Sequence, residues 1–213
     1  MTWEEHRSAA EEFALIELWE QAAAHYVHAA ALLMQSKRLE DTPEITYLQL
    51  RAGQAFLEQE DPTAAEPILG NALKLATLIE YAELLPEIQS ALGEAHATQG
   101  NHLAAIPCFE AALGKTLDPE LYLHLTLSQL ALGQEPEGLK SLERACKIHY
   151  RAKNLEGMVT CVSRAAAVSE DAGYKKLARS LYKKALQLVE IWPQCDPAHQ
   201  AELQARYDTL SAP

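Results

Sequence analysis

The chain has 213 residues, of which 48% are hydrophobic and 23% charged, and its formal net charge is −12. No stretch is apolar for long enough to cross a bilayer, and the start lacks a charged segment followed by an apolar run, so we expect a cytoplasmic protein rather than an integral membrane protein. Residues 1–135 hold 21 acidic and 6 basic side chains, whereas residues 136–213 hold 9 acidic and 12 basic ones. This polarity disfavours nucleic-acid binding by the whole body and permits head-to-tail self-association.

Helical periodicity dominates the chain, and no strand-like alternation occurs, so an all-α protein is predicted. Asp61-Pro62, Asp118-Pro119 and Asp196-Pro197 each pair an N-capping carboxylate with a proline at the first helical position. Gly100 and the later Gly133 and Gly173 are expected at turns, where glycine tolerates a positive φ. Helices are predicted near 3–17, 20–37, 44–59, 62–80, 84–99, 102–115, 119–132, 135–153, 155–172, 175–191 and 197–210.

One helical hairpin is especially clear in the stretch from Leu92 to Leu113. Small residues such as Gly93 stand where two helices approach closely, Phe109 fills the gap between them, and Gly100-Asn101 separates the two helices. The same steps of 3, 4, 5, 4 and 3 residues recur four more times along the chain. The five copies start at Ala10, Gly53, Gly93, Thr126 and Ala166. A lone hairpin cannot bury its apolar face, so the copies are expected to stack.

This spacing resembles the tetratricopeptide repeat, and the longer copies are similar to repeats of the kinesin-light-chain type. The resemblance implies a right-handed α-solenoid of about five hairpins, with repeats near 3–40, 43–81, 84–116, 119–154 and 155–191. The segment 196–211 is expected to be a helix that caps the last repeat.

Candidates for reactive chemistry are few. His25 and His28 lie three residues apart on one helix, which is compatible with a metal pair, but no carboxylate or cysteine accompanies them. Three of the four cysteines (Cys108, Cys146 and Cys161) occupy apolar helix positions, which favours packing. His96 takes the place of the family's aromatic residue and is expected to be packed and hydrogen-bonded. No catalytic or phosphate-binding motif occurs, so we expect no enzyme activity, cofactor or metal.

The resemblance also implies a concave groove lined by the first helix of each repeat. The lining carries no Lys or Asn clamp, which argues against the C-terminal tails of Hsp70 or Hsp90 as partners. Its apolar and acidic positions instead indicate a peptide or amphipathic helix with basic residues. The leucines among them could equally pack inside the protein. The expected lining residues are Tyr47, Leu50, Gln54, Leu57, Glu87, Glu94, Glu120, Leu123, Leu127, Leu130 and Glu170.

A basic stripe provides an alternative function. Its residues recur every three or four positions along two outer helices, so they share one convex face. Such a face is either simply solvated or associates with an acidic protein, an anionic membrane surface or RNA. The stripe residues are Lys140, Arg144, Lys147, Arg151, Lys176, Arg179 and Lys183. The favoured function is nevertheless a non-catalytic adaptor that binds a partner protein in the groove, within a larger assembly.

Overall fold

The computed structural model describes residues 1–114, 117–192 and 194–211, and within them it contains eleven α-helices, a short 3-10 helix (Leu39–Asp41) and no strand. Every helix bound lies within two residues of its predicted position, apart from residue 115, which falls outside the described residues. The helices are α1 (Trp3–Leu15), α2 (Trp19–Ser36), α3 (Thr42–Glu58), α4 (Pro62–Leu78), α5 (Leu85–Thr98), α6 (His102–Leu113), α7 (Pro119–Ala131), α8 (Glu135–Arg151), α9 (Leu155–Asp171), α10 (Lys175–Glu190) and α11 (Pro197–Ser211).

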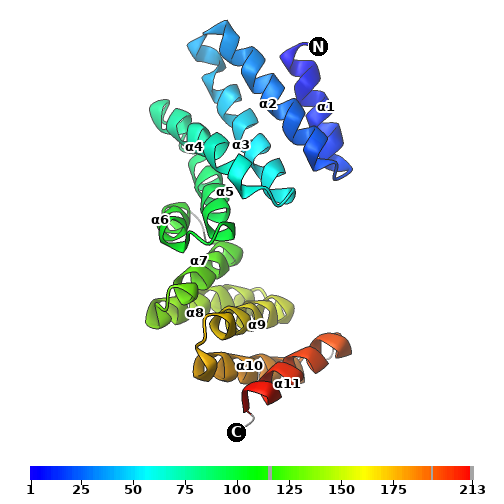
Figure 1. Cartoon of the computed structure of the whole chain (residues 1–213), viewed down its shortest axis with the longest axis vertical. Helices are drawn as coiled ribbons and strands as arrows, with labels where there is room; N and C mark the ends of the chain where they lie inside the picture. Colours follow the sequence, from blue (N-terminus) through cyan, green and yellow to red (C-terminus); the bar gives the residue numbers. More distant parts are fainter. Residues whose placement is uncertain (115–116, 193, 212–213) are drawn as a thin grey trace. The chain divides into compact units, whose positions relative to one another are not determined.

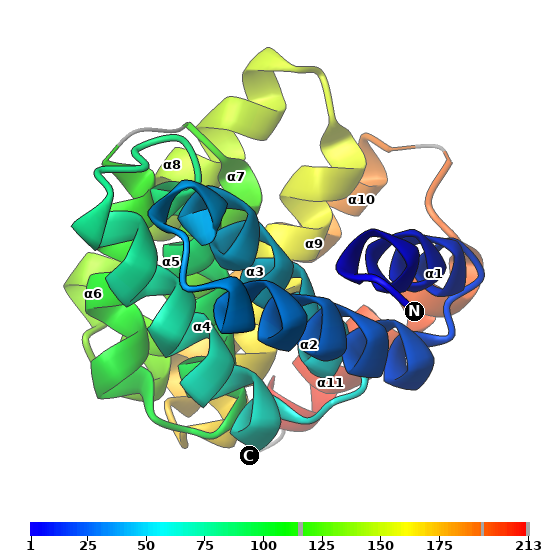
Figure 2. The same cartoon turned by 90° about the horizontal axis from the view of Figure 1, so that it is seen from above.

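Consecutive helices pack as pairs: α1 with α2, α3 with α4, α5 with α6, α7 with α8, and α9 with α10. The chain divides into two compact units, Met1–Lys115 and Thr116–Pro213, which we call unit 1 and unit 2. Unit 1 contains α1 to α6, and α1 and α2 lie side by side in both views (Figures 1 and 2). Unit 2 contains α7 to α11, and α11 packs against α10.

Glycines allow the paired helices of unit 1 to approach closely. A Cβ atom added to Gly53 would lie 2.4 Å from Cγ of Leu69, and one added to Gly93 would lie 2.6 Å from Cε1 of Phe109. Leu69 and Phe109 are completely buried. In the α7–α8 pair the second helix supplies the glycine, because a Cβ on Gly138 would lie 2.7 Å from Cδ2 of Leu130.

The turn inside each pair has one conformation in all five hairpins. One residue takes a positive φ, and the next N–H donates to the carbonyl five residues earlier, as in Asn101 to His96 at 2.8 Å and Gln134 to Gln129 at 2.9 Å. The predicted glycines occupy three of these positions, and glutamates occupy the other two. The φ values are 59° at Glu17, 58° at Glu60, 76° at Gly100, 73° at Gly133 and 84° at Gly173.

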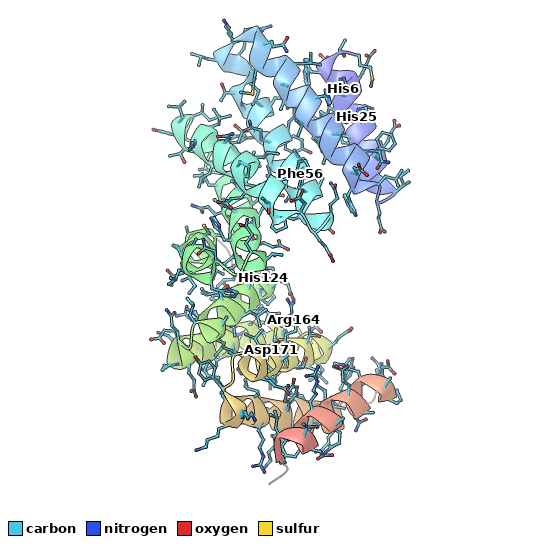
Figure 3. All side chains as sticks on the ribbon, in the orientation of Figure 1. His6, His25, Phe56, His124, Arg164 and Asp171 are labelled. Atoms are coloured by element: carbon cyan, nitrogen blue, oxygen red, sulfur yellow. The ribbon has the colours of Figure 1, made fainter. Side chains whose placement is uncertain are left out.

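Three histidines meet between α1 and α2, and Figure 3 labels two of them, His6 and His25. The Nδ1 atoms of His6 and His25 lie 3.1 Å apart, so one donates a hydrogen bond to the other only while the pair is not fully protonated. The ring of His6 stacks on that of His28 at a centroid distance of 5.4 Å. Burial, followed by the charges of His25 and His28, lowers the pKa of His6.

Other expected core residues behave as apolar packing groups. All four cysteines are free thiols, and Cys161 is fully buried. Burial raises the pKa of Cys146 to about 11 and that of Cys161 to about 12, so both stay protonated at neutral pH. His96 is packed as expected, but its Nδ1 has no hydrogen-bond partner among the described residues and lies 3.9 Å from Oε1 of Glu66.

The positive φ at Glu60 gives a first prediction. Replacing Glu60 with glycine removes the steric cost of a left-handed L-residue, about 1 kcal/mol, and should raise the urea midpoint of unfolding. As a control, Gly100→Ala should lower the midpoint by a similar free energy, because a Cβ at Gly100 meets no atom within 4 Å and only its φ is strained. A Glu60→Gly variant less stable than the natural chain would contradict this account.

The histidine cluster predicts a pH dependence. Folding lowers the pKa of His6 below its ordinary value of 6.5, so the unfolded chain takes up a proton there more readily than the folded one. The free energy of unfolding that His6 contributes is complete above pH 6.5. It is lost as the pH falls through the pKa of His6 in the folded chain. Urea midpoints measured from pH 7.5 to 5.5 should decline, and His6→Gln should flatten the decline. Equal slopes in both proteins would rule out this role of His6.

Candidate functional site

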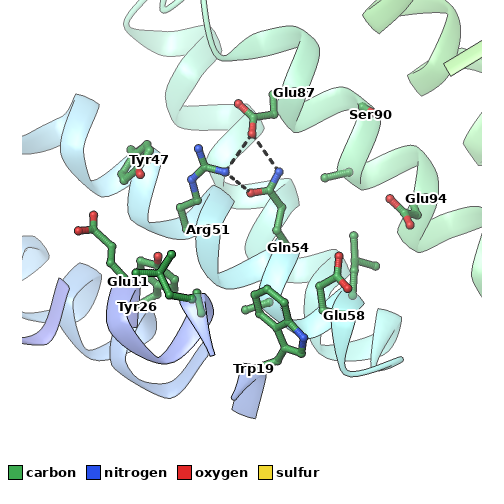
Figure 4. A pocket seen from close by; sticks show the side chains of 15 residues that line it. Glu11, Trp19, Tyr26, Tyr47, Arg51, Gln54, Glu58, Glu87, Ser90 and Glu94 are labelled. Atoms are coloured by element: carbon green, nitrogen blue, oxygen red, sulfur yellow. Dashed lines mark hydrogen bonds and ion pairs between the residues drawn. The ribbon is translucent and has the colours of Figure 1, made fainter. Parts of the chain in front are cut away.

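A cavity of about 640 Å³ opens on unit 1 (Figure 4). It lies between residues of α1, α2, α3 and α5, so the first helices of the first three pairs all contribute. Apolar and aromatic residues make up most of its wall, and four carboxylates and one guanidinium are placed among them. The lining residues are Glu11, Ala14, Leu15, Trp19, Tyr26, Tyr47, Arg51, Gln54, Ala55, Leu57, Glu58, Glu87, Ser90, Ala91 and Glu94.

Helical spacing brings these side chains to one face. On α3, Tyr47, Arg51, Gln54 and Glu58 follow one another at steps of four, three and four residues, which places them in one row. On α5, Glu87, Ser90 and Glu94 follow one another at steps of three and four residues and also form one row. The buried residues Tyr26, Ala55 and Ala91 belong to the hydrophobic core. The position of the row is therefore fixed by the packing of the helices that carry it.

Arg51 is the basic residue of the wall, and its charge is already balanced. Its Nη1 lies 3.2 Å from Oε1 of Glu87 and donates to Oε1 of Gln54 at 2.9 Å, while Gln54 Nε2 donates to the same Glu87 oxygen at 3.0 Å (Figure 4). Burial opposes the charged form of Arg51, but a hydrogen bond with Tyr47 and the charge of Glu87 outweigh it and raise the Arg51 pKa. Arg51 therefore stays a cation paired with Glu87.

The ring of Tyr47 contacts both Arg51 and a second guanidinium. Cζ of Arg7 and Cζ of Arg51 each lie 5.1 Å from the centroid of this ring, within the range of a cation–π contact. Arg7 in turn donates to Glu11 at 2.9 Å and to Glu44 at 2.7 Å. The carboxylate of Glu11 is thus balanced as well.

Two carboxylates of the cavity have no such partner. Glu58 and Glu94 are exposed, and within the described part of the chain neither forms an ion pair or a side-chain hydrogen bond. Because Glu11 and Glu87 are balanced by Arg7 and Arg51, the remaining negative charge of the cavity lies at these two positions.

Five of the groove residues predicted in unit 1 lie in the wall of this cavity. Tyr47, Gln54, Leu57, Glu87 and Glu94 all line the cavity. The expectation for Leu50 is wrong, because this side chain is completely buried in the core formed with α4 and α5.

In unit 2 the predicted lining residues interact mainly with their own chain. Leu123 and Leu130 are completely buried and pack inside unit 2, whereas Leu127 is half-buried. Glu120 is exposed, and its Oε1 lies 3.8 Å from Nε2 of the buried His149. Oε2 of Glu170 accepts hydrogen bonds from Tyr182 at 3.0 Å and from Arg206 on α11 at 3.3 Å.

Among the cavity residues that the sequence reasoning missed are Glu11, Trp19, Tyr26 and Arg51. It did not extend the lining to the first copy, from which Glu11 comes, or to second helices such as α2, which supplies Trp19 and Tyr26. The rarity of basic residues in the acidic N-terminal part was a usable signal, since both Arg7 and Arg51 stand on first helices.

All residues of the predicted basic stripe are exposed, but two of them face another helix of unit 2. Cζ of Arg179 lies 5.7 Å from the ring centroid of Tyr207 on α11. Hydrogen bonds from Arg179 and Ser211, with a smaller effect of the charge of Lys183, lower the pKa of Tyr207. In α8, Cζ of Arg144 lies 5.7 Å from the ring centroid of Tyr122. The other five residues form the open part of the stripe: Lys140, Lys147, Arg151, Lys176 and Lys183.

Metal binding and membrane insertion were also tested on the described residues. No group of three or more His, Cys, Asp or Glu side chains there is arranged to hold a metal ion, the His25 and His28 region included. None of the helices in that part of the chain combines the length and the apolar character that a membrane span requires.

The chain was compared with known proteins. Residues 50–122 match the family model "Tetratricopeptide repeat", and a search of curated proteins found no match. Among solved structures, the MamA protein superimposes with a TM-score of 0.66 at 17% identity, covering 91% of this chain and 96% of that one. A putative kinesin light chain of Podosopora anserina with nearly identical TPR-like repeats superimposes with a TM-score of 0.66 at 18% identity. The match covers 90% of this chain and 97% of that one. YrrB, described as a TPR protein with an unusual peptide-binding site, superimposes with a TM-score of 0.64 at 15% identity. The match covers 94% of this chain and 90% of that one.

These matches agree with the paired helices, the close glycine contacts and the repeated turns described above. At such low identity the solved structures establish the fold alone, and the family model adds the sequence signature of the central repeats. The chain therefore has the tetratricopeptide-repeat fold, and its residues 50–122 carry the sequence signature of that family.

Proposed function

We propose that the chain is a non-catalytic adaptor that binds a peptide segment of a partner protein in the cavity of unit 1. The observation that carries this proposal is the cavity itself, which joins an apolar and aromatic wall to polar groups held in fixed positions. Such a wall buries apolar side chains of a ligand, while the few polar groups orient it. YrrB, which has the same fold, is described as having a peptide-binding site, and this supports the class of ligand.

The shape of the wall favours a short segment over a folded domain. The row on α3 and the row on α5 face the same hollow, and each presents a polar side chain about every turn of helix. A peptide laid across both rows meets alternating apolar and polar groups, which suits an amphipathic segment. The acidic residues that outnumber basic ones over 1–135 would speed the arrival of a partner with basic residues.

Filling the cavity tests this function. A phage-displayed library of random dodecapeptides is selected on the immobilised full chain, and enriched peptides are resynthesised with a fluorescent label for anisotropy measurements. Ser90→Trp places an indole in the cavity and should weaken binding at least about tenfold. Asn71→Trp adds the same side chain at an exposed position of α4 and should leave binding unchanged. Thermal unfolding checks that both variants are folded.

Two results would refute the peptide-binding function. One is a selection that enriches no sequence above background. The other is a set of peptides that bind Ser90→Trp as tightly as the natural chain, because such peptides bind outside the cavity.

A second candidate function uses the basic stripe of unit 2. Beside Arg151, at the C-terminal end of α8, lies a smaller hollow of about 440 Å³. It is lined by Tyr150, Arg151, Lys153, Leu155 and Met158. Tyr150 is 70% exposed. Two cations beside apolar side chains favour association with an anionic surface, for which a membrane rich in phosphatidylserine is the simplest case.

Vesicle flotation tests this second function. The full chain should float with phosphatidylserine vesicles at low salt and dissociate as salt increases, because screening weakens such contacts. Replacing Lys140, Lys147 and Arg151 with glutamine should reduce flotation, whereas replacing Lys37 and Lys74 of unit 1 should not. Absence of salt-sensitive flotation of the natural chain would exclude this function.

A further inference from the structure

The wall of the cavity repeats one arrangement of three groups. In it, a guanidinium lies over an aromatic ring and is also held by a carboxylate. Arg51 lies over Tyr47 at 5.1 Å and pairs with Glu87 at 3.2 Å. Arg7 lies over the same ring at 5.1 Å and pairs with Glu11 at 2.9 Å. Each combination holds the cation by the face of the ring and by hydrogen bonds to a carboxylate.

Another aromatic ring and a third carboxylate lie at the other end of α3 without a cation. Trp19 begins α2, lines the cavity, and packs against the core cluster that contains Ala55. Glu58 follows Ala55 by one turn of α3 and lines the same cavity (Figure 4). Glu94 of α5 adds a second carboxylate to this wall. Among the described residues, no Lys or Arg forms an ion pair with Glu58 or Glu94.

We propose that Trp19, Glu58 and Glu94 form a subsite for an arginine side chain of the bound peptide. This inference rests on the peptide-binding function proposed above and names the side chain that the cavity selects. The incoming guanidinium completes the third combination: it stacks on the indole and donates to the carboxylates, which both lack a cation of their own. The half-buried Trp19 and the two exposed carboxylates remain accessible from the open side of the cavity.

Arginine suits this subsite better than lysine. Its guanidinium is flat and offers donors in a fixed fork, so it stacks on a ring and bonds to carboxylates at the same time, whereas an ammonium acts as a point charge. Arg7 and Arg51 already use this geometry in the same wall. Glu58 and Glu94 also provide two negative charges, so one bound guanidinium leaves no excess positive charge in the cavity.

The experiment uses the dodecapeptides selected on the full chain. Enriched sequences should share an arginine, and the peptide with the highest affinity is resynthesised with citrulline or lysine at that position. Citrulline keeps the shape but removes the charge and should weaken binding about tenfold, with lysine intermediate. The Glu58→Gln/Glu94→Gln variant should bind the arginine peptide about tenfold more weakly and should no longer distinguish it from the citrulline peptide. Trp19→Leu, which keeps both carboxylates, should reduce the preference for arginine over lysine.

A matched control separates the subsite from the general charge of the chain. Glu83→Gln/Glu110→Gln removes the same charge from exposed positions outside the cavity and should leave binding within twofold of the natural chain. Peptides that lack arginine, lose binding to Ser90→Trp and ignore Glu58→Gln/Glu94→Gln would overturn the arginine subsite while preserving the peptide-binding function. A selection without any binder would overturn both.

Discussion

Close contact between a small residue on one helix and a bulky residue on its partner is the constraint on which the architecture depends. Where a glycine faces Leu69 or Phe109, no larger residue fits without a shift of that side chain. Each contact sets the separation of two helices, and the next pair packs against the surface that results. The rows of side chains on α3 and α5 face a common hollow because α5 packs against both α3 and α4.

Much of the fold was predictable because this constraint is local in sequence. The steps between Gly93, Gly100 and Phe109 describe one hairpin completely, and periodicity plus the capping residues located the other helices. The site was less predictable. A helical face shows which residues point inward, but Leu50 and Tyr47 differ in exposure because of the helices that cover them. Ion pairs such as Arg51 with Glu87 join residues 36 positions apart, and only the packed structure brings them together.

Charge in the cavity of unit 1 is organised in pairs rather than spread evenly. Arg7 and Arg51 use two of the few cations in the N-terminal part of the chain, and both are fixed beside Tyr47. Holding two guanidinium groups against one ring makes this part of the wall rigid, since each guanidinium has at least two partners. The uncompensated charge is confined to the end near Trp19. The recognition that we propose therefore depends on which carboxylates remain unpaired and not on net charge.

The turn at Glu17 lies beside this same end, between Leu15 and Trp19, which both line the cavity. An L-residue held at a φ of 59° stores steric strain that glycine would not. Local opening of this hairpin tip releases the strain, so it needs less free energy than opening an equivalent turn built on glycine. The strained turn therefore places a point of low local stability next to two residues of the cavity wall.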